Sequence, residues 1–345
     1  MILHVVHAEK FIAPFVELVN QNFDRSKHLF FVMGNTDKYP VQDAKNVVVI
    51  KRKILSKMTA LLWLSVLMNR ADKIMLHGLF RGRIILLLLL QFWLLKKCYW
   101  FIWGKDLYTY QVGRKKLFWR LKELIRRPVI RNIGNLVTYV KGDFDLAREW
   151  YGATGRYHEC ILYPSNIYQD ITEDLDVDTN INIQVGNSAD PSNEHVEIFN
   201  ILHAYKDRDI KVYVPISYGD NEYRENVALA GRDMLGEKFI PMTEFMPISA
   251  YIKFLNRIDI AIFNHKRQQG MGNVITLLGL GKKVYMRKDI SSWDVFAELG
   301  VQLFDVANIS IDKLDKKTAE LNSEMIKRYF SKPNLCSQLT TIFAV

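Results

Sequence analysis

The chain has 345 residues and is 49% hydrophobic, which is enough to bury more than one core, and its length favours two domains. Its net charge of +10 is unevenly spread, because residues 1–150 carry +15 and the remainder carries −5. The 3 cysteines are far apart and fit neither a disulfide framework nor a zinc site, and no secretory signal is recognisable. These features exclude a disulfide-stapled secreted domain and favour a cytoplasmic protein.

Short apolar segments alternate with helical patterns along the first half of the chain. We expect a helix near residues 14–23 and strands at residues 2–6, 29–33, 47–50, 74–76, 99–102, 136–140 and 160–163. This alternation predicts a parallel sheet covered by helices. Residues 169–180 are acidic with little apolar content, and we interpret them as a linker. The first domain is therefore expected to span residues 1–168.

The basic first half indicates an anionic partner, either nucleic acid or a membrane surface. Residues 84–95 are an apolar run bracketed by basic residues, namely Arg81, Arg83, Lys96 and Lys97. The run is too short for a bilayer span of roughly 20 residues. It is either a helix lying at the lipid interface or a buried helix of an α/β domain. The basic cluster at residues 114–127 is likewise either interfacial or a solvated face. We favour an anionic membrane surface over nucleic acid.

A second alternating series follows the linker. We expect strands at residues 181–185, 211–215, 239–240, 258–263 and 283–286, with helices at residues 193–205, 222–234, 248–256 and 274–280. The second domain is expected to span residues 181–345, with a last helix that can cross back to the first domain. The fold class is therefore α/β, with two doubly wound Rossmann-like domains facing a cleft, the architecture called GT-B.

The segment 267–273 joins a predicted strand to a predicted helix through glycines. Free N–H groups, the helix dipole and close backbone approach make such a junction an anion site, although glycines there also serve packing alone. The candidate ligands of a diphosphate or donor sugar in this segment are Lys266, Arg267, Gln268, Gln269, Gly270, Gly272 and Asn273.

Two other strand ends belong to the same predicted edge. Gly186, Asn187 and Ser188 follow the strand at residues 181–185 and suit the other side of a pyrophosphate. Asn193 either contributes to this site or caps a helix. Tyr218 follows the next strand and either stacks on a base or packs in the core.

Three blocks taken in order, residues 101–108, 185–195 and 267–272, resemble the signature of one family, and His77-Gly78 and Asn221-Glu222 also fit. It is the TDP-N-acetylfucosamine:lipid II N-acetylfucosaminyltransferases, the 4-alpha-L-fucosyltransferase family of bacterial polysaccharide assembly, and the likeness covers residues 3–299. The resemblance implies transfer of a 4-acetamido-4,6-dideoxyhexose (Fuc4NAc-like) from a dTDP-sugar to an undecaprenyl-diphosphate-linked saccharide. It implies a peripheral enzyme at the cytoplasmic face of the inner membrane, active in enterobacterial common antigen or O-antigen (lipopolysaccharide) synthesis.

Glycosyl transfer needs a neutralised leaving group and, where it inverts the sugar carbon, a base. We expect no metal and no other cofactor, so that cations and helix dipoles hold the diphosphate. His7, Glu9, His77 and Asp106 lie at predicted strand ends and have the side chains of a base, although each can serve structure instead. The alternatives are a nucleotide-sugar epimerase of the same fold and a nucleic-acid binder, which the acidic second half disfavours.

Overall fold

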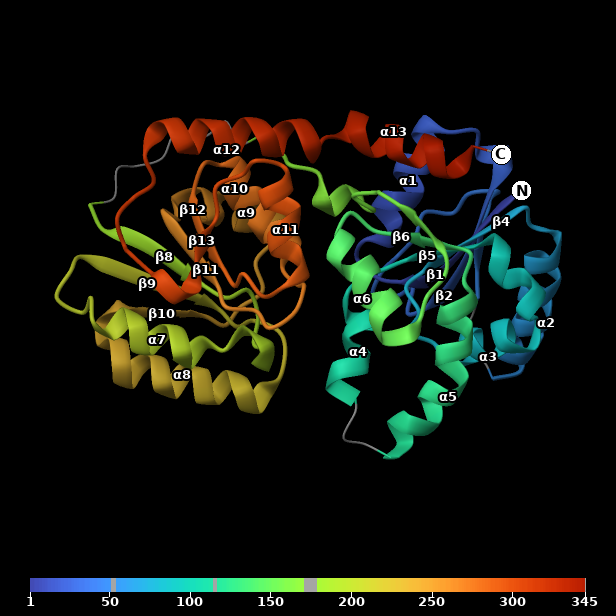
Figure 1. The fold of residues 1–345 in the computed structure, drawn as a ribbon, viewed down its shortest axis with the longest axis horizontal. Coiled ribbons are helices and arrows are strands. Elements are labelled where there is room, and N and C mark those ends of the chain that lie inside the picture. Colours follow the sequence, from blue (N-terminus) through green and yellow to red (C-terminus); the bar gives the residue numbers. More distant parts are fainter. Residues whose placement is uncertain (51–53, 114–116, 171–178, 345) are drawn as a thin grey trace. The chain divides into compact units, whose positions relative to one another are not determined.

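The computed structural model describes residues 1–50, 54–113, 117–170 and 179–344. The chain forms two compact units (Figure 1): unit 1 comprises Met1–Ser165 and Lys332–Val345, and unit 2 comprises Asn166–Ser331. The division therefore differs from the expected linker at residues 169–180. Tyr168 already belongs to unit 2, because its ring packs on Gly279 and its N–H donates to the Phe330 carbonyl at 2.8 Å. The most acidic part of the expected linker, residues 171–178, lies outside the described residues.

Unit 1 is built on a parallel sheet with the strand order β3-β2-β1-β4-β5-β6-β7. The strands are β1 (Ile2–Ala8), β2 (His28–Gly34), β3 (Val47–Val49), β4 (Lys73–His77), β5 (Cys98–Phe101), β6 (Asn135–Val137) and β7 (Arg156–His158). The last strand thus precedes the expected one at residues 160–163. That segment has no ladder partner among the described residues, although the Cys160 N–H donates to the Thr138 carbonyl at 3.4 Å, and its side chains are buried.

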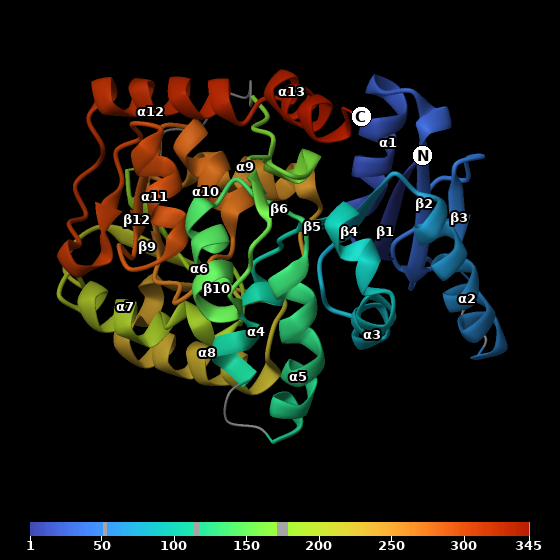
Figure 2. The same cartoon turned by 45° about the vertical axis from the view of Figure 1, so that its right-hand side comes forward.

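Both faces of this sheet are covered, as the nearly continuous apolar runs of its central strands require. The helices are α1 (Ile12–Asn22), α2 (Ile54–Arg70), α3 (Gly82–Leu90), α4 (Lys105–Gly113), α5 (Leu117–Asn132), α6 (Lys141–Tyr151) and α13 (Lys332–Phe343). Leu3 and Val5 face the core shared with α2 and α3, whereas His4 faces Phe15 of α1 and Phe343 of α13. Figure 2 shows α1 and α13 on one face of the sheet and α2 and α3 on the other.

Unit 2 repeats the design with the strand order β10-β9-β8-β11-β12-β13. Its strands are β8 (Ile181–Val185), β9 (Ile210–Pro215), β10 (Phe239–Met242), β11 (Ile260–Phe263), β12 (Lys283–Met286) and β13 (Phe304–Asp305). Its helices are α7 (His195–His203), α8 (Asn221–Leu235), α9 (Ile248–Arg257), α10 (Met271–Gly279), α11 (Ser291–Glu298) and α12 (Lys316–Tyr329). Figures 1 and 2 agree that α7 and α8 cover one face, while α10 and α12 cover the other.

Each sheet has one point where the strand order reverses. In unit 1 the reversal lies between β1 and β4, and in unit 2 it lies between β8 and β11. Ligands of open parallel sheets bind outside the carboxyl ends of the strands at such a point. The loops that follow β8 and β11, and those that follow β1 and β4, are therefore where a site belongs.

Candidate functional site

In unit 2 the loops after β8 and β11 each turn on a glycine. Gly186 has a φ of 69°, and a Cβ there would lie 2.4 Å from His195 Nε2. Gly270 has a φ of 66°, and a Cβ there would lie 3.0 Å from His265 Cε1. Left-handed backbone and close neighbours both require glycine at these two positions. The two loops consequently present backbone at the switch point, as an anion site needs.

Asn193 shapes the first of these loops from below. Its Oδ1 accepts from the Asn187 N–H at 3.2 Å, and its Nδ2 donates to the carbonyls of Ser188 and Asp190 at 3.1 and 3.0 Å. The side chain is fully buried. Helix capping, the alternative considered for this segment, falls instead to Asp190, whose carboxylate accepts from the Ser192 N–H at 3.0 Å. Asn193 therefore holds the loop in shape.

The helix α10 begins immediately after Gly270, and no side chain caps its first turn. Gly272 and Asn273 lie in that turn, whose N–H groups and dipole favour an anion. Beneath the loop His265 is fully buried, and among the described residues neither of its ring nitrogens has a hydrogen-bond partner in good geometry. Burial, with the neighbouring Arg267 charge, lowers the pKa of His265 to about 3. An open helix terminus above a buried, neutral and unpaired imidazole has the character of a binding site.

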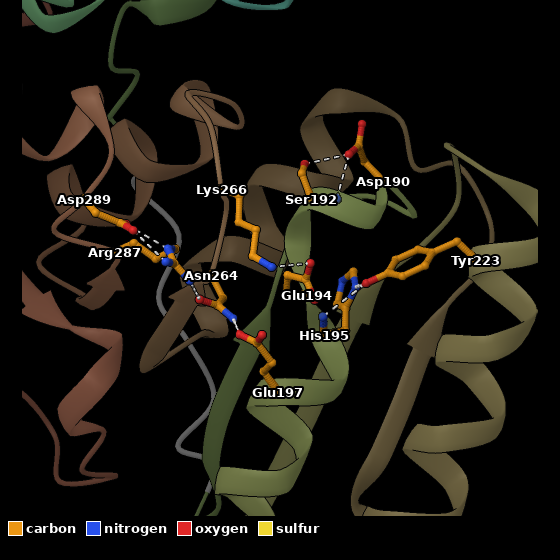
Figure 3. Close-up of polar contacts among 10 residues, drawn as sticks. All are labelled: Asp190, Ser192, Glu194, His195, Glu197, Tyr223, Asn264, Lys266, Arg287 and Asp289. Atoms are coloured by element: carbon orange, nitrogen blue, oxygen red, sulfur yellow. Dashed lines mark hydrogen bonds and ion pairs between the residues drawn. The ribbon is translucent and has the colours of Figure 1, made fainter. Parts of the chain in front are cut away.

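The cations of this edge are each held by a carboxylate. Lys266 Nζ lies 2.8 Å from Glu194 Oε1, a contact that Figure 3 shows, and Arg267 Nη2 lies 2.8 Å from Asp190 Oδ2. Burial opposes ionisation of Asp190, but hydrogen bonds from Ser192 and the Arg267 charge outweigh it and lower the pKa of that carboxyl. The β8–α7 and β11–α10 loops are thus joined by two ion pairs.

Gln269 adds a third link between the loops. Its Nε2 donates to Asn187 Oδ1 at 3.4 Å, and its Oε1 lies 2.9 Å from Ser192 Oγ. Gln268 is half-buried beside it, and its carbonyl accepts a hydrogen bond from Arg267 Nη1 at 3.4 Å. The structure therefore brings Gly186, Asn187 and Ser188 together with the 266–273 segment, as the sequence predicted for one edge.

Arg287 is a cation of the same edge that the sequence analysis missed. It follows β12 directly and pairs with Asp289 through two contacts of 2.6 and 2.8 Å (Figure 3). Asn264 joins it to α7, because Asn264 Nδ2 donates to Glu197 Oε2 at 2.7 Å. A cavity of about 380 Å³ opens beside these residues, within the size range of ligand pockets. The sequence offered one clue to Arg287, namely its position directly after a predicted strand. Arg267 likewise comes soon after a strand end.

Tyr218 lies on the other side of the switch point, after β9. Its side chain is 48% exposed. Burial of its hydroxyl raises its pKa, and the hydroxyl bonds with Ser188 and Asn187. The ring is therefore anchored to the glycine loop and open to a flat partner, which favours the base-stacking interpretation over core packing.

In unit 1 the four expected base candidates separate into two pairs. His77 is buried, with Nε2 lying 3.1 Å from His4 Nδ1 and Nδ1 lying 2.7 Å from Tyr163 Oη. Asp106 is buried and accepts four hydrogen bonds, from the N–H groups of Leu79, Trp103 and Leu107 and from the Trp100 indole. Both side chains are committed to internal contacts at the ends of β4 and β5.

His7 and Glu9 lie at the end of β1 and are only half-buried. The Arg81 guanidinium contacts His7 Nε2. Burial, and then the Arg81 charge, lower the pKa of His7, so its ring is neutral at pH 7. The Glu9 carboxylate makes no hydrogen bond or ion pair with any described residue. Of the four, Glu9 is therefore the candidate whose side chain has no such contact with a described residue.

Aspartates spaced as Asp-X-Asp, a pattern that often marks metal-dependent sugar transfer, occur at residues 143–145, 174–178 and 207–209. Asp143 is buried at the start of α6 and faces the Tyr108 hydroxyl at 3.1 Å, and Asp209 precedes β9 at the opposite edge of its sheet. Residues 174–178 lie outside the described residues. Within the described ranges, no three His, Cys, Asp or Glu side chains gather where they could hold a metal ion.

The sequence model of the family described as 4-alpha-L-fucosyltransferase glycosyl transferase group 56 matches residues 5–343. Solved structures of the same fold include HepE of Anabaena in complex with UDP, with a TM-score of 0.69, 11% identity and 99% of each chain covered. WaaG, a glycosyltransferase involved in lipopolysaccharide biosynthesis, has a TM-score of 0.58 and 10% identity, with 98% of this chain and 93% of that chain covered. The sucrose-phosphate synthase of Thermosynechococcus elongatus has a TM-score of 0.65 and 10% identity, with 99% of this chain and 98% of that chain covered. The expected GT-B fold is confirmed.

Proposed function

Because the chain belongs to the 4-alpha-L-fucosyltransferase family, glycosyl transferase group 56, and is a glycosyltransferase, we propose that its donor is a dTDP-sugar carrying a 4-acetamido-4,6-dideoxyhexose. The proposed acceptor is a saccharide on undecaprenyl diphosphate, in the synthesis of enterobacterial common antigen or O-antigen. The observation that carries the donor side is the pair of glycine loops at the β8/β11 switch point, with an uncapped α10 above the unpaired His265.

In this proposal the leaving diphosphate binds the first turn of α10 and the Gly186–Ser188 loop. Lys266, Arg267 and Arg287 supply the positive charge that the departing group needs. Asp190 and Glu194 orient two of these cations before the donor arrives. Tyr218 provides a face for the thymine ring, and the half-buried amides of Gln268 and Gln269 provide hydrogen bonds to the sugar or phosphate. No metal takes part in this arrangement.

Calorimetric titration with dTDP, UDP and GDP, with and without magnesium, tests the donor class. We expect dTDP to bind most tightly and magnesium to change its Kd by less than about 3-fold, which corresponds to under about 1 kcal/mol. A preference for UDP or GDP would leave the fold in place and overturn the proposed donor. Magnesium-dependent binding would instead overturn the metal-free arrangement.

We expect Arg267→Ala to weaken dTDP binding by about 10-fold or more, because it removes a charge-assisted contact and leaves the half-buried Asp190 without its cation. The measurement is the calorimetric Kd for dTDP. Arg232→Ala, which removes an exposed cation from α8 of the same unit, is the matched control and should bind dTDP normally. Wild-type affinity in Arg267→Ala would remove this arginine from the diphosphate site.

The proposed membrane partner is supported by an exposed apolar face of unit 1, which we call the α2–α5 face. Of the run at residues 84–95, Ile84, Ile85, Leu88, Leu94 and Leu95 are buried. The other large apolar side chains of the face are exposed, namely Leu62, Trp63, Val66, Leu86, Leu90, Phe92, Trp93, Leu121 and Leu124. The run therefore has features of both expected alternatives, the buried helix and the interfacial helix, because one side packs in the core and the other is exposed to solvent.

The elements that carry these side chains are neighbours. Trp93 Nε1 donates to Asn69 Oδ1 of α2 at 3.0 Å, and α3 packs against α5. Exposed cations of α5 accompany them, at Arg120, Lys122 and Arg131. Apolar side chains beside cations suit a surface of anionic lipid. No described helix has the length and apolar character to cross a membrane. Arg126 of the basic cluster is buried against Glu123, and residues 114–116 lie outside the described residues.

Reversing three of the exposed cations of α5 (Arg120→Glu, Lys122→Glu, Arg131→Glu) should weaken binding to vesicles of one-third anionic lipid by about 100-fold, at roughly 1 kcal/mol per cation. Sedimentation with the vesicles measures this. The control reverses Arg232, Lys316 and Lys317 of unit 2, which changes the net charge equally and should leave binding intact. An equal loss of vesicle binding in both variants would show that net charge alone controls binding, and would contradict the proposed role of the α2–α5 face.

A further inference from the structure

Four aromatic side chains meet at the carboxyl ends of β1, β4 and β5 in unit 1. Trp103 lies at their centre, with its ring centroid 5.4 Å from Phe80, 5.8 Å from Phe11 and 5.6 Å from Tyr163. All three neighbours meet it edge to face, at interplanar angles of 68–87°. Tyr163 is buried, Phe11 and Trp103 are half-buried, and Phe80 is exposed. The cluster therefore ends at the surface, at the switch point of this sheet.

The backbone is adapted to seat these rings. Gly78 has a φ of 80°, and a Cβ there would lie 2.3 Å from the Phe80 ring. Gly78 thus allows the Phe80 ring to fold back over the end of β4. The Trp103 N–H donates to the buried carboxylate of Asp106 at 3.0 Å, which fixes the loop that carries the indole.

A chain of buried side chains fixes the indole from beneath. Trp103 Nε1 donates to Tyr163 Oη at 2.7 Å, and Tyr163 Oη lies 2.7 Å from His77 Nδ1. His77 Nε2 lies 3.1 Å from His4 Nδ1, and His4 Nε2 lies 3.0 Å from His28 Nδ1. Burial lowers the pKa of all three histidines, to about 3 for His77 and about 4 for His28, so the rings are neutral.

An indole N–H can only donate, so Tyr163 Oη accepts from Trp103 Nε1. When the Tyr163 hydroxyl in turn donates to His77 Nδ1, His77 and His4 carry their protons on Nε2 and each donates to the next ring. In this arrangement each contact of the chain pairs one donor with one acceptor, and together these contacts orient Trp103.

We propose that Trp103 and Phe80, with Phe11 behind them, form the subsite on which a pyranose ring of the acceptor saccharide stacks. This rests on the proposed function. A pyranose has an apolar C–H face, which the negative face of an aromatic ring attracts, and a rim of hydroxyls. Polar side chains border the cluster to meet that rim: His7 lies near the end of β1, Glu9 follows it, and Lys10 Nζ lies 5.0 Å from the centroid of the Phe11 ring. Tyr163 and His77 are positioning residues.

The test uses soluble acceptors, so that membrane binding does not intervene. A panel of octyl-diphosphate-linked disaccharides of N-acetylhexosamines and hexuronic acids is screened with a dTDP-4-acetamido-4,6-dideoxyhexose, and the best acceptor is kept. We expect Trp103→Ala to raise the acceptor KM by about 10-fold or more, with the dTDP Kd unchanged. Tyr163→Phe keeps its ring but leaves the indole N–H unpaired, and should raise the acceptor KM by a smaller factor, about 3-fold, with kcat preserved. Leu229→Ala, which truncates an exposed apolar side chain of α8 in unit 2, is the control.

Saturation-transfer NMR of the same panel needs no turnover and separates the two levels of the proposal. Wild-type protein that binds dTDP and a disaccharide but transfers nothing would count against the proposed reaction and leave the subsite standing. An acceptor KM and saturation transfer that are unchanged in Trp103→Ala, in a variant with the native melting temperature, would overturn the subsite. The same result from Leu229→Ala as from Trp103→Ala would also overturn it.

Discussion

Glu9→Gln should slow sugar transfer by roughly 100-fold to 10,000-fold, the usual contribution of a general base. The substitution keeps the size of the side chain and removes its proton affinity. Glu9 is the candidate whose carboxylate has no hydrogen bond or ion pair among the described residues, at the end of a strand beside the switch point of unit 1. The measurement is kcat with a saturating acceptor, together with the calorimetric Kd for dTDP, which should not change.

The matched control is Glu17→Gln on α1, an exposed carboxylate that accepts a hydrogen bond from Gln21 at 2.9 Å. It should transfer sugar at the wild-type rate. A kcat within about 3-fold of wild type in Glu9→Gln would remove Glu9 as the base. Determining the anomeric configuration of the product by NMR then shows whether the reaction inverts, and so whether any base is needed.

Asp106→Asn should unfold unit 1 more easily and should not act on the chemical step. The carboxylate accepts four hydrogen bonds in a fully enclosed position, and burial raises its pKa against the effect of these bonds. An amide offers one acceptor oxygen and turns its N–H₂ group toward the remaining donors. Unsatisfied buried groups cost about 1–3 kcal/mol each, so we expect a loss of about 2–5 kcal/mol and a melting temperature lower by roughly 5–15 °C.

Thermal unfolding followed by circular dichroism measures this loss. Asp145→Asn on α6 changes an exposed carboxylate of the same unit in the same way and should leave the melting temperature within about 1–2 °C. An Asp106→Asn variant with native stability and greatly reduced kcat would contradict the structural role and return Asp106 to the list of catalytic candidates.

The architecture was predictable because its signals are local. Apolar strands alternating with helical patterns indicate parallel sheets, and the glycines at 186 and 270 mark turns that only glycine tolerates. Both sheets and the glycine loops of the 181–280 region follow from these patterns. The two-residue strand β13 escaped prediction since so short a segment carries no periodicity.

The roles of individual side chains were less predictable. His77 and Glu9 both lie at strand ends, yet His77 points into the layer under α1 while Glu9 belongs to the loop beyond its strand. In a sheet covered on both faces, alternation does not reveal which polar residue is enclosed. Asn193 looks like a helix cap in sequence, and its contacts with the 187–190 loop depend on how that loop folds back. The ion pairs of Glu194 with Lys266 and of Asp190 with Arg267 could not be predicted for the same reason.

The return of α13 to unit 1 has a consequence for biosynthesis. The ring centroids of Phe343 and His28 lie 4.7 Å apart. Lys73 Nζ donates to the Ile342 carbonyl at 2.7 Å, and Gln338 Oε1 accepts from the Ile161 N–H at 2.8 Å. The helix α13 thus closes one face of a unit whose other elements precede unit 2 in the chain. Domains usually complete folding in their order of synthesis. Here unit 1 is whole only after residues 332–343 have been synthesised, whereas the contiguous unit 2 is complete at residue 331, so the nascent chain can finish unit 2 first.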